Sequence, residues 1–314
     1  MVINVTKFFY HVVFMKNKVT EHHPWLDFRG GYDRHCLYSR VFSWISLPAR
    51  DRNIMRANST TPECSVNTRY TASHSTLSQG LFHSLTRGMG FELPSDFHEW
   101  AADRGLYVPH GRKRRQRMDL IARRGVLFIH VPKNAGTSIA TALYGRPMLH
   151  ETMHFFTRTA PATLRQIPSV AILRDPVARF VSSYCYARAG GGRHRQVVDT
   201  FRDRYMKFRS VDDALDHVEN ARSIYGMDHI FRPQSWYVND RSEQVLVDHL
   251  VPLSAVANLH RVLPAFRGVR IQHLNESLDH DIVLTGRQTA RIHAIYHQDV
   301  LLYDRSIKNA DRFR

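Results

Sequence analysis

The stretch "GVLFIHVPKNAGTSIATALYG", residues Gly125 to Gly145, decides the fold of this chain. Its first seven residues form an apolar run of strand length, which is typical of a parallel strand buried on both faces. A loop rich in Asn, Gly, Thr and Ser follows Pro132. The next apolar residues predict a short helix that ends at Gly145. A buried strand, a tight loop and a helix in this order indicate an α/β unit.

A second unit of the same kind begins at "SVAIL", residues 169–173, which predicts another buried strand. It runs directly into "RDPVARFVSSYCYARAGGG", where Asp175 suits the N-cap of a helix and Pro176 its first turn. The glycines at 190–192 predict the end of that helix. Further helices are predicted over 210–222 and 287–306, and weaker strands over 244–253 and 268–274.

Strands that alternate with helices predict a parallel sheet flanked by helices. We therefore expect an α/β fold, a P-loop-like three-layer α/β/α arrangement with a central parallel sheet, over residues 119–314. Residues 76–118 are predicted to be a helical and basic segment that leads into it. Residues 1–75 are rich in Ser, Thr, Asn and Arg without a sustained period, and we expect a variable or poorly ordered extension.

The charge of the chain favours an anionic partner. The 314 residues carry a net charge of +16 and give a pI near 10.1, which suits nucleic acid, a phosphorylated or sulfated cofactor, an acidic polymer or a membrane surface. The densest basic run is "GRKRRQRM", residues 111–118. It is either the solvated face of a helix or an arm that binds anions, and the sequence leaves both interpretations open.

Cysteine usage and hydropathy bear on the compartment. Cys36, Cys64 and Cys185 are scattered and odd in number, so they predict neither a disulfide framework nor a zinc site, and we expect a reducing, cytoplasmic setting. The apolar run from Phe8 to Phe14 is shorter than the roughly 18 residues that span a bilayer, and no cleavage site follows it. Neither a transmembrane segment nor a signal peptide is expected. The oligomeric state stays open.

The loop after the first strand is predicted to bind an anion. Free backbone N–H groups and the helix dipole make the N-terminus of a helix a site for negative charge. Gly136 allows a close approach of the backbone, Thr137 and Ser138 offer hydroxyl donors, and Lys133 adds a positive charge.

The second strand end supplies a similar set of groups. Arg174 follows the strand directly, and Ser182 comes eight residues later on the predicted helix. Ligands of open α/β sheets bind outside the carboxyl ends of the strands, so the two ends together indicate one ligand with two phosphate-like groups. The alternative for Arg174 is a structural pair with Asp175 or another carboxylate.

"HVPKNAGTSI" and "ILRDPVARFVSSY" together resemble the two cofactor motifs of sulfotransferases that use 3'-phosphoadenosine 5'-phosphosulfate. Within that family the chain looks most similar to the carbohydrate branch, which includes the heparan sulfate 2-O-sulfotransferases and bacterial members. The resemblance covers roughly Leu120 to Tyr303, including "FRPQSWYV" and "IYHQDVLLY". It implies that the first motif holds the 5'-phosphosulfate through Lys133, Asn134, Ala135, Gly136, Thr137, Ser138 and Ile139. It also implies that Arg174 and Ser182 hold the 3'-phosphate.

The resemblance also implies a His-x-Thr-like element between the motifs, which His150 and Thr152 match. Histidine suits a general base because its ordinary pKa lies near neutrality. His154, one helical turn on, and Glu151 are further candidates for the base. Lys133 is expected to stabilise the leaving oxygens, and the scheme needs no metal.

The expected reaction is transfer of a sulfuryl group to a hydroxyl of a carbohydrate or glycoconjugate, and the positive charge of the chain would suit an acidic glycan. Gln234 and Trp236 are candidates to line the cleft, although Trp236 also suits an ordinary core position. Two alternatives remain. A P-loop kinase or nucleotide-binding enzyme lacks its G-x-x-x-x-G-K-[ST] motif here, although Asp175 could serve as its metal-binding carboxylate. A basic nucleic-acid-binding protein lacks a zinc-finger or aromatic RNA-binding signature.

Overall fold

The computed structural model describes residues 86, 88, 91–93, 95–192, 195–271 and 282–310 of the chain. All of them fall within one compact unit, Tyr70–Arg314. The extension predicted over residues 1–75 and the apolar run from Phe8 to Phe14 lie outside the described residues. Among those that are described, no helix is long and apolar enough to cross a membrane.

The central sheet has three parallel strands in the order β1-β2-β5. They are β1 (Leu127–Ile129), β2 (Ser169–Leu173) and β5 (His249–Pro252). Every residue of β1 and β2 is buried, as expected for a parallel sheet that is covered on both faces. The two strands lie side by side in register, with Phe128 opposite Val170. The α/β prediction with a parallel sheet flanked by helices is therefore confirmed.

The weaker strand predictions had different outcomes. The segment predicted over 244–253 contains β5, which pairs with β2 at the edge of the sheet. Residues 268–271, the described part of the segment predicted over 268–274, do not form a strand, and the rest of that segment lies outside the described residues. Gly268, the first residue of this segment, has a φ of 72°. This left-handed conformation interrupts extended backbone.

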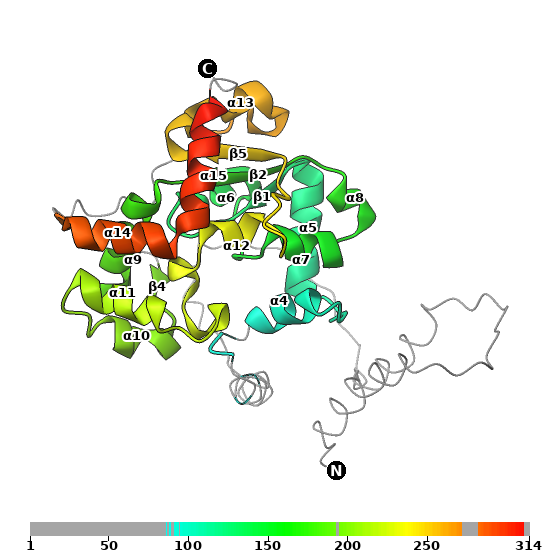
Figure 1. The fold of residues 1–314 in the computed structure, drawn as a ribbon. Helices are drawn as coiled ribbons and strands as arrows, with labels where there is room; N and C mark the ends of the chain where they lie inside the picture. Colours follow the sequence, from blue (N-terminus) through cyan, green and yellow to red (C-terminus); the bar gives the residue numbers. More distant parts are fainter. Residues whose placement is uncertain are drawn as a thin grey trace, which may run out of the picture. The chain divides into compact units, whose positions relative to one another are not determined.

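Helices cover the sheet and enclose the first of two apolar cores. The long helix α15 (His297–Lys308) crosses β2 and β5 (Figure 1). The basic helix α5 (Arg112–Arg124) packs against β1 and against α6 (Gly136–Tyr144). Short elements complete this part: α4 (Asp96–Asp103), α7 (Met153–Thr159), α8 (Ala162–Arg165), α12 (Gln234–Val238), η4 (Leu253–Asn258), α13 (Leu259–Val262) and η5 (Pro264–Phe266).

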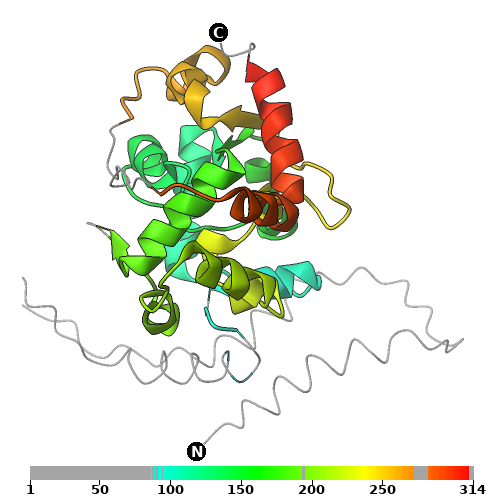
Figure 2. The same ribbon diagram turned by 60° about the vertical axis from the view of Figure 1, so that its left-hand side comes forward.

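A second apolar core surrounds α9 (Pro176–Arg188), the helix that leaves the end of β2. Figure 2 shows α9 running away from the sheet beside α14. Phe180, Tyr205 and Phe231 are buried within this core. The remaining elements here are β3 (Gly191–Gly192), β4 (Arg195–Gln196), α10 (Asp199–Tyr205), α11 (Val211–Glu219), η2 (Ile224–Gly226), η3 (His229–Phe231) and α14 (Gly286–Ile295).

The predicted start of α9 is confirmed. The carboxylate of Asp175 accepts a hydrogen bond of 2.8 Å from the backbone N–H of Ala178, and Pro176 occupies the first turn. The single helix predicted over 287–306 is wrong, because α14 and α15 are separated at Tyr296. The ring of Tyr296 is buried in the second core, and its hydroxyl donates a 2.7 Å bond to the carbonyl of Phe231. One straight helix could not both anchor there and cross the sheet.

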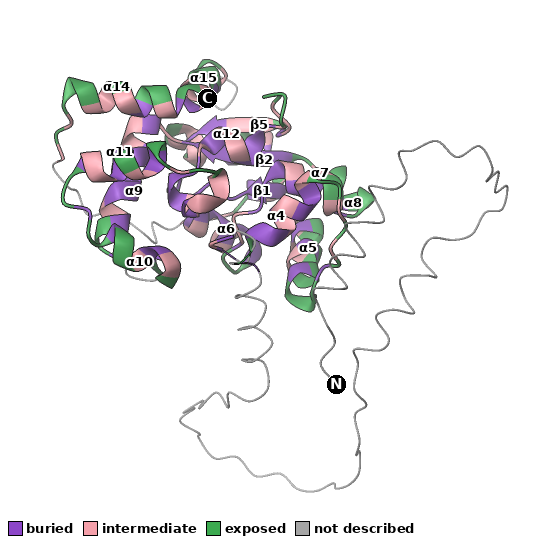
Figure 3. Cartoon of the chain, turned by 60° about the horizontal axis from the view of Figure 1, so that its bottom comes forward, coloured by how far each residue is buried: buried purple, intermediate pink, exposed green. Residues whose placement is uncertain are grey.

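The basic run at 111–118 forms the start of α5, in agreement with the interpretation as a solvated helix face. Figure 3 shows exposed residues along α5 and buried residues in the strands of the sheet. Met118 and Ile121 point into the core, whereas Arg112, Lys113 and Arg115 are exposed. One basic residue departs from this pattern. Arg114 is buried, and its Nε lies 2.6 Å from Oε1 of Glu151.

A buried ion pair connects α4 to the segment before α12. The guanidinium of Arg232 donates two bonds to the carboxylate of Asp96, at 2.9 and 2.5 Å, and both side chains are fully buried. The guanidinium also donates to the carbonyl of Met227. Water cannot replace a partner here, so each charge depends on the other.

Asp96→Ala is expected to lower the free energy of unfolding by about 3–5 kcal/mol, because it leaves the charge of Arg232 buried without a partner. Urea unfolding followed by circular dichroism measures the change. The matched control is Arg241→Ala, which removes the exposed partner of Asp103 and is expected to cost less than about 1 kcal/mol. Similar losses in the two variants would contradict this assignment of a structural ion pair.

Candidate active site

The loop between β1 and α6 has an unusual backbone. Lys133 and Ala135 have φ values of 68° and 58°, whereas Asn134 between them does not have a positive φ. Left-handed conformations are uncommon for residues other than glycine and concentrate at binding sites. Alternating backbone conformations of this kind turn successive N–H groups toward one concavity, and the loop leads directly into the N-terminus of α6. This backbone is suited to bind an anion.

Buried amide groups hold the loop against the second strand. Nδ2 of Asn134 donates to the carbonyl of Ile172 at 2.7 Å and to Oε1 of Gln234 at 2.6 Å. The same Oε1 accepts from the backbone N–H of Arg174, and Nε2 of Gln234 donates to the carbonyl of Arg174. The backbone N–H of Gln234 is bound in turn by the carboxylate of Asp299 on α15. The side chain of Gln234 therefore forms hydrogen bonds with the segments that follow both β1 and β2.

Arg179, which lies one turn into α9, supports the loop from below. Its side chain is buried, and its Nε donates a 3.1 Å bond to the carbonyl of Pro132. Its Nη2 donates to the carbonyls of Arg232 and Ile230 at 2.7 and 3.3 Å. Carbonyl oxygens satisfy its donors without neutralising its charge. Arg179 therefore positions the loop and also adds positive charge beneath it.

Lys133 lies in a basic environment. Its Nζ sits 4.1 Å from the centre of the Tyr186 ring, in a cation–π contact. Burial, together with the nearby charges of Arg174 and Arg179, lowers the pKa of its amine to about 8. Among the described residues Lys133 forms no salt bridge. A bound anion would supply the missing negative charge. Residues with a strongly shifted pKa are common at functional sites.

Arg174 also lies in partly buried, basic surroundings. Its Nη1 donates a long bond of 3.4 Å to the carbonyl of Lys133, and burial is the main cause that lowers the pKa of its guanidinium. The carboxylate of Asp175 caps α9, and no described carboxylate forms a salt bridge with Arg174. The nearby charge of Asp175 nevertheless opposes the effect of burial on the pKa of Arg174. Ser182, the other residue predicted to bind the second phosphate, is buried on α9.

A row of three histidines lies beside the loop, and only one of them, His150, was predicted from the sequence. The ring centres of His130 and His150 are 4.2 Å apart, and those of His150 and His229 are 5.3 Å apart. His130 directly follows β1, so its place at a strand end was the signal that could have identified it. Gly136 makes room for this ring, since a Cβ on Gly136 would lie 1.9 Å from Cδ2 of His130. The glycine therefore has a packing role in addition to the predicted approach to a phosphate.

The hydrogen bonds of these histidines indicate their tautomers. Nδ1 of His150 lies 3.0 Å from the carbonyl of His130, and Nδ1 of His130 lies 3.2 Å from the carbonyl of Met148. A carbonyl oxygen only accepts, so Nδ1 carries the proton in both rings. In the neutral imidazole the lone pair is then on Nε2. His150 has the tautomer that a general base would use.

The other two candidates for the base have different surroundings. The carboxylate of Glu151 is held by Arg114 in a buried ion pair. Nε2 of His154 lies 3.7 Å from Oδ1 of Asp103 and borders a separate cavity. Burial lowers the pKa of His154. Of the three candidates, His150 is the one whose ring lies beside that of His130, which borders the loop.

Gln234 and Trp236 occupy different environments. Gln234 is fully buried and belongs to the network that supports the loop. Trp236 packs on the first core, but its ring also lies 6.4 Å from that of His229 and borders the same cavity as His154. Both predicted roles of Trp236, as a core residue and as a cleft residue, therefore describe part of its position.

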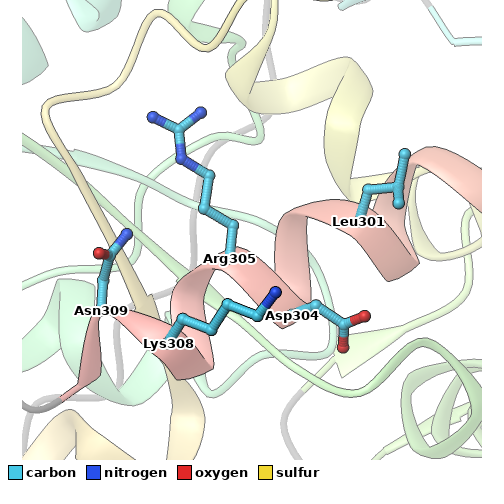
Figure 4. Close-up of a pocket in the computed structure, with 5 residues that line it drawn as sticks. All are labelled: Leu301, Asp304, Arg305, Lys308 and Asn309. Atoms are coloured by element: carbon cyan, nitrogen blue, oxygen red, sulfur yellow. The ribbon is translucent and has the colours of Figure 1, made fainter.

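A hollow on the surface of α15 does not resemble a ligand site. Its volume is about 500 Å³, and Figure 4 shows that the side chains lining it come from one helix and its C-terminal end. Four of the five are exposed. The residues are Leu301, Asp304, Arg305, Lys308 and Asn309. A site for a small molecule usually gathers side chains from several elements, as the region around Lys133 does.

Comparisons with protein-family models, with curated proteins and with solved structures gave no match to the chain. The class of protein is therefore defined by the fold and the site alone. The chain is an α/β protein in which a basic loop and a row of histidines lie at the carboxyl end of a small parallel sheet.

Lys133→Met is expected to stabilise the folded protein at pH 7 by about 1–3 kcal/mol, because the pKa of the amine falls from 10.5 to about 8 on folding. Between these pH values the unfolded chain binds more protons, so the stability of the wild type rises with pH in this window. The variant lacks this rise. Urea unfolding at pH 7 and pH 9.5 compares the two proteins, and equal pH slopes would show that Lys133 is not desolvated.

Proposed function

We propose that the chain is a sulfotransferase that moves a sulfuryl group from 3'-phosphoadenosine 5'-phosphosulfate to a hydroxyl group. The observation that carries this proposal is the cationic cluster of Lys133, Arg174 and Arg179, for which no described carboxylate supplies a salt bridge. It lies where the two motifs of the sequence meet at the ends of neighbouring strands. Ligands of α/β sheets with P-loop-like layers bind at this edge.

The donor has two anionic groups, and the site offers two sets of donors. The backbone N–H groups from Asn134 to Ile139, with the hydroxyls of Thr137 and Ser138, would bind the 5'-phosphosulfate. Arg174 and Ser182 would bind the 3'-phosphate. Gln234 supports this division, because its amide binds both Asn134 of the first motif and Arg174 of the second. One buried side chain thereby sets the spacing between the two phosphate sites.

The chemistry is an in-line displacement at sulfur. The acceptor oxygen forms a bond to sulfur while the bond from sulfur to the 5'-phosphate oxygen breaks. The products are a sulfate ester and adenosine 3',5'-bisphosphate. Nε2 of His150 takes the proton of the acceptor hydroxyl, since Nδ1 is already protonated against the carbonyl of His130. Lys133 offsets the charge that develops on the leaving phosphate, and this charge in turn raises the pKa of the Lys133 amine.

The donor site is tested by isothermal titration calorimetry with adenosine 3',5'-bisphosphate, beside ATP with magnesium. We expect the bisphosphate to bind without added metal and to lose at least about tenfold in affinity, about 1.4 kcal/mol, in Arg174→Ala and in Lys133→Met. Arg188→Ala, an exposed arginine at the far end of α9, is the matched control and should bind normally. Preference for magnesium ATP, or no binding by the folded chain, would overturn the proposal and favour a kinase or a nucleic-acid-binding protein.

The identity of the general base is tested by measuring the transfer of labelled sulfate from the donor to a panel of carbohydrates. His150→Gln should lower kcat by about 10²–10⁴-fold while the bisphosphate still binds, because proton transfer is lost and the phosphate site is intact. His154→Gln should leave kcat within a few fold. The opposite pattern would assign the proton transfer to His154, and a loss in Glu151→Gln alone would assign it to Glu151.

A further inference from the structure

A second cavity lies between α4, α7, η2 and the segment that follows α12. Its volume is about 240 Å³, below the roughly 300–1,000 Å³ of pockets for drug-sized ligands, so it suits a single small ring. Side chains from four elements and a loop meet there. They are Glu99, Asp103, Thr152, His154, Ile224, Tyr225, Trp236, Asn239, Asp240 and Arg241.

Two buried polar atoms of this cavity lack hydrogen-bond partners. Asn239 is only 8% exposed, and its Oδ1 makes no hydrogen bond. Nε2 of His154 is also buried without a hydrogen bond. Nearly all buried polar atoms of folded proteins are bonded, and leaving one unbonded costs about 1–3 kcal/mol. The amide oxygen of Asn239 can only accept, so it requires an N–H or O–H group from a ligand or a water molecule.

The charges of the cavity disfavour an anionic ligand. Arg241 is the only cationic side chain in its lining, and it is paired with the carboxylate of Asp103. The carboxylate of Asp240 accepts bonds from the backbone N–H groups of Ser242 and Gln244, which does not neutralise its charge. A carboxylate or sulfate on the ligand would lie near Asp240 without a free cation to bind it.

The remaining titratable groups and the aromatic rings point to an uncharged ligand. Burial raises the pKa of Glu99 to about 8, although Thr152 donates two hydrogen bonds to it. Burial also lowers the pKa of His154, so both side chains are mostly neutral at pH 7. The rings of Tyr225 and Trp236 supply apolar surface. The cavity therefore suits a ring that carries hydroxyl groups at its edge and C–H groups on its faces. The hydroxyl groups would bond to the isolated polar atoms, and the C–H groups would contact the aromatic rings.

The cavity borders the histidine row. Thr152 lies two residues after His150 and lines the cavity. The ring of Trp236, which also lines it, lies 6.4 Å from that of His229, and the His229 ring lies 5.3 Å from that of His150. The histidine row therefore extends from the candidate base toward the wall of the cavity.

We propose that this cavity binds one uncharged sugar ring of the acceptor through a hydroxyl group donated to Oδ1 of Asn239 and a second hydrogen bond with Nε2 of His154. The inference rests on the proposed sulfotransferase function and deepens it. It narrows the acceptor from any hydroxyl compound, or an acidic glycan, to a glycoconjugate with a neutral residue at this position. Acidic residues of the same glycan would have to lie outside the cavity.

Saturation-transfer NMR on the full chain tests this inference with the methyl glycosides of glucose, galactose and mannose, and with glucuronate at the same concentration. We expect at least one neutral glycoside to bind and glucuronate not to bind. Asn239→Leu and His154→Phe each remove one hydrogen-bonding group and should weaken binding by about tenfold. Asn220→Leu, at the exposed end of α11, is the matched control and should bind as the wild type does.

Absence of binding by every neutral glycoside, tighter binding of glucuronate, or equal binding by Asn239→Leu and the wild type would overturn the inference. Calorimetry with adenosine 3',5'-bisphosphate on the same variants separates this failure from a failure of the proposed function. If the bisphosphate binds and the glycosides do not, only the sugar site is wrong. If the glycosides bind as expected and the bisphosphate does not, the donor chemistry is wrong and the cavity remains a sugar site.

Discussion

The site depends on the amide of Gln234, a fully buried side chain that bonds to both strand ends. Its Oε1 accepts from Asn134 and from the backbone of Arg174, and its Nε2 donates back to the carbonyl of Arg174. Hydrogen bonds in a medium of low polarity are strong, and breaking one leaves a buried polar group unbonded. The network therefore fixes the loop after β1 relative to the helix after β2. The left-handed backbone of Lys133 and Ala135 persists because its surroundings are fixed in this way.

Fixing the loop brings positive charges together at a cost in stability. Burial disfavours the charges of Lys133 and Arg174, and the nearby charge of Arg179 adds to this effect at both residues. Natural proteins often accept such strain where a ligand will bind. The buried pair of Asp96 and Arg232 shows the contrasting solution, in which each charge has a partner and the result is structural. This difference between the two arrangements is the reason that we propose a binding site at the first and assign a structural role to the second.

The histidine row connects the two regions to which we assign function. His130 follows the strand that leads into the loop, the ring of His150 lies beside it, and the ring of His229 lies between His150 and Trp236, which lines the second cavity. This row of rings leads from the loop toward the cavity that we propose for the acceptor. Burial lowers the pKa of His229 well below its ordinary value, so this ring is neutral. A neutral imidazole is the form that accepts a proton.

The sequence by itself determined the elements that local chemistry controls. The apolar runs of β1 and β2, the cap formed by Asp175 and the glycine that ends α6 all follow from a few adjacent residues, and each lies where the sequence predicted. The tertiary structure decided everything that depends on residues distant in the chain. Glu151 pairs with Arg114, 37 residues earlier, and Asn134 bonds to Gln234, 100 residues later. Tyr296 divides a predicted single helix because its partner, Phe231, lies 65 residues away. Periodicity and turn residues report on neighbours along the chain, whereas these contacts form only when packing brings separate elements together.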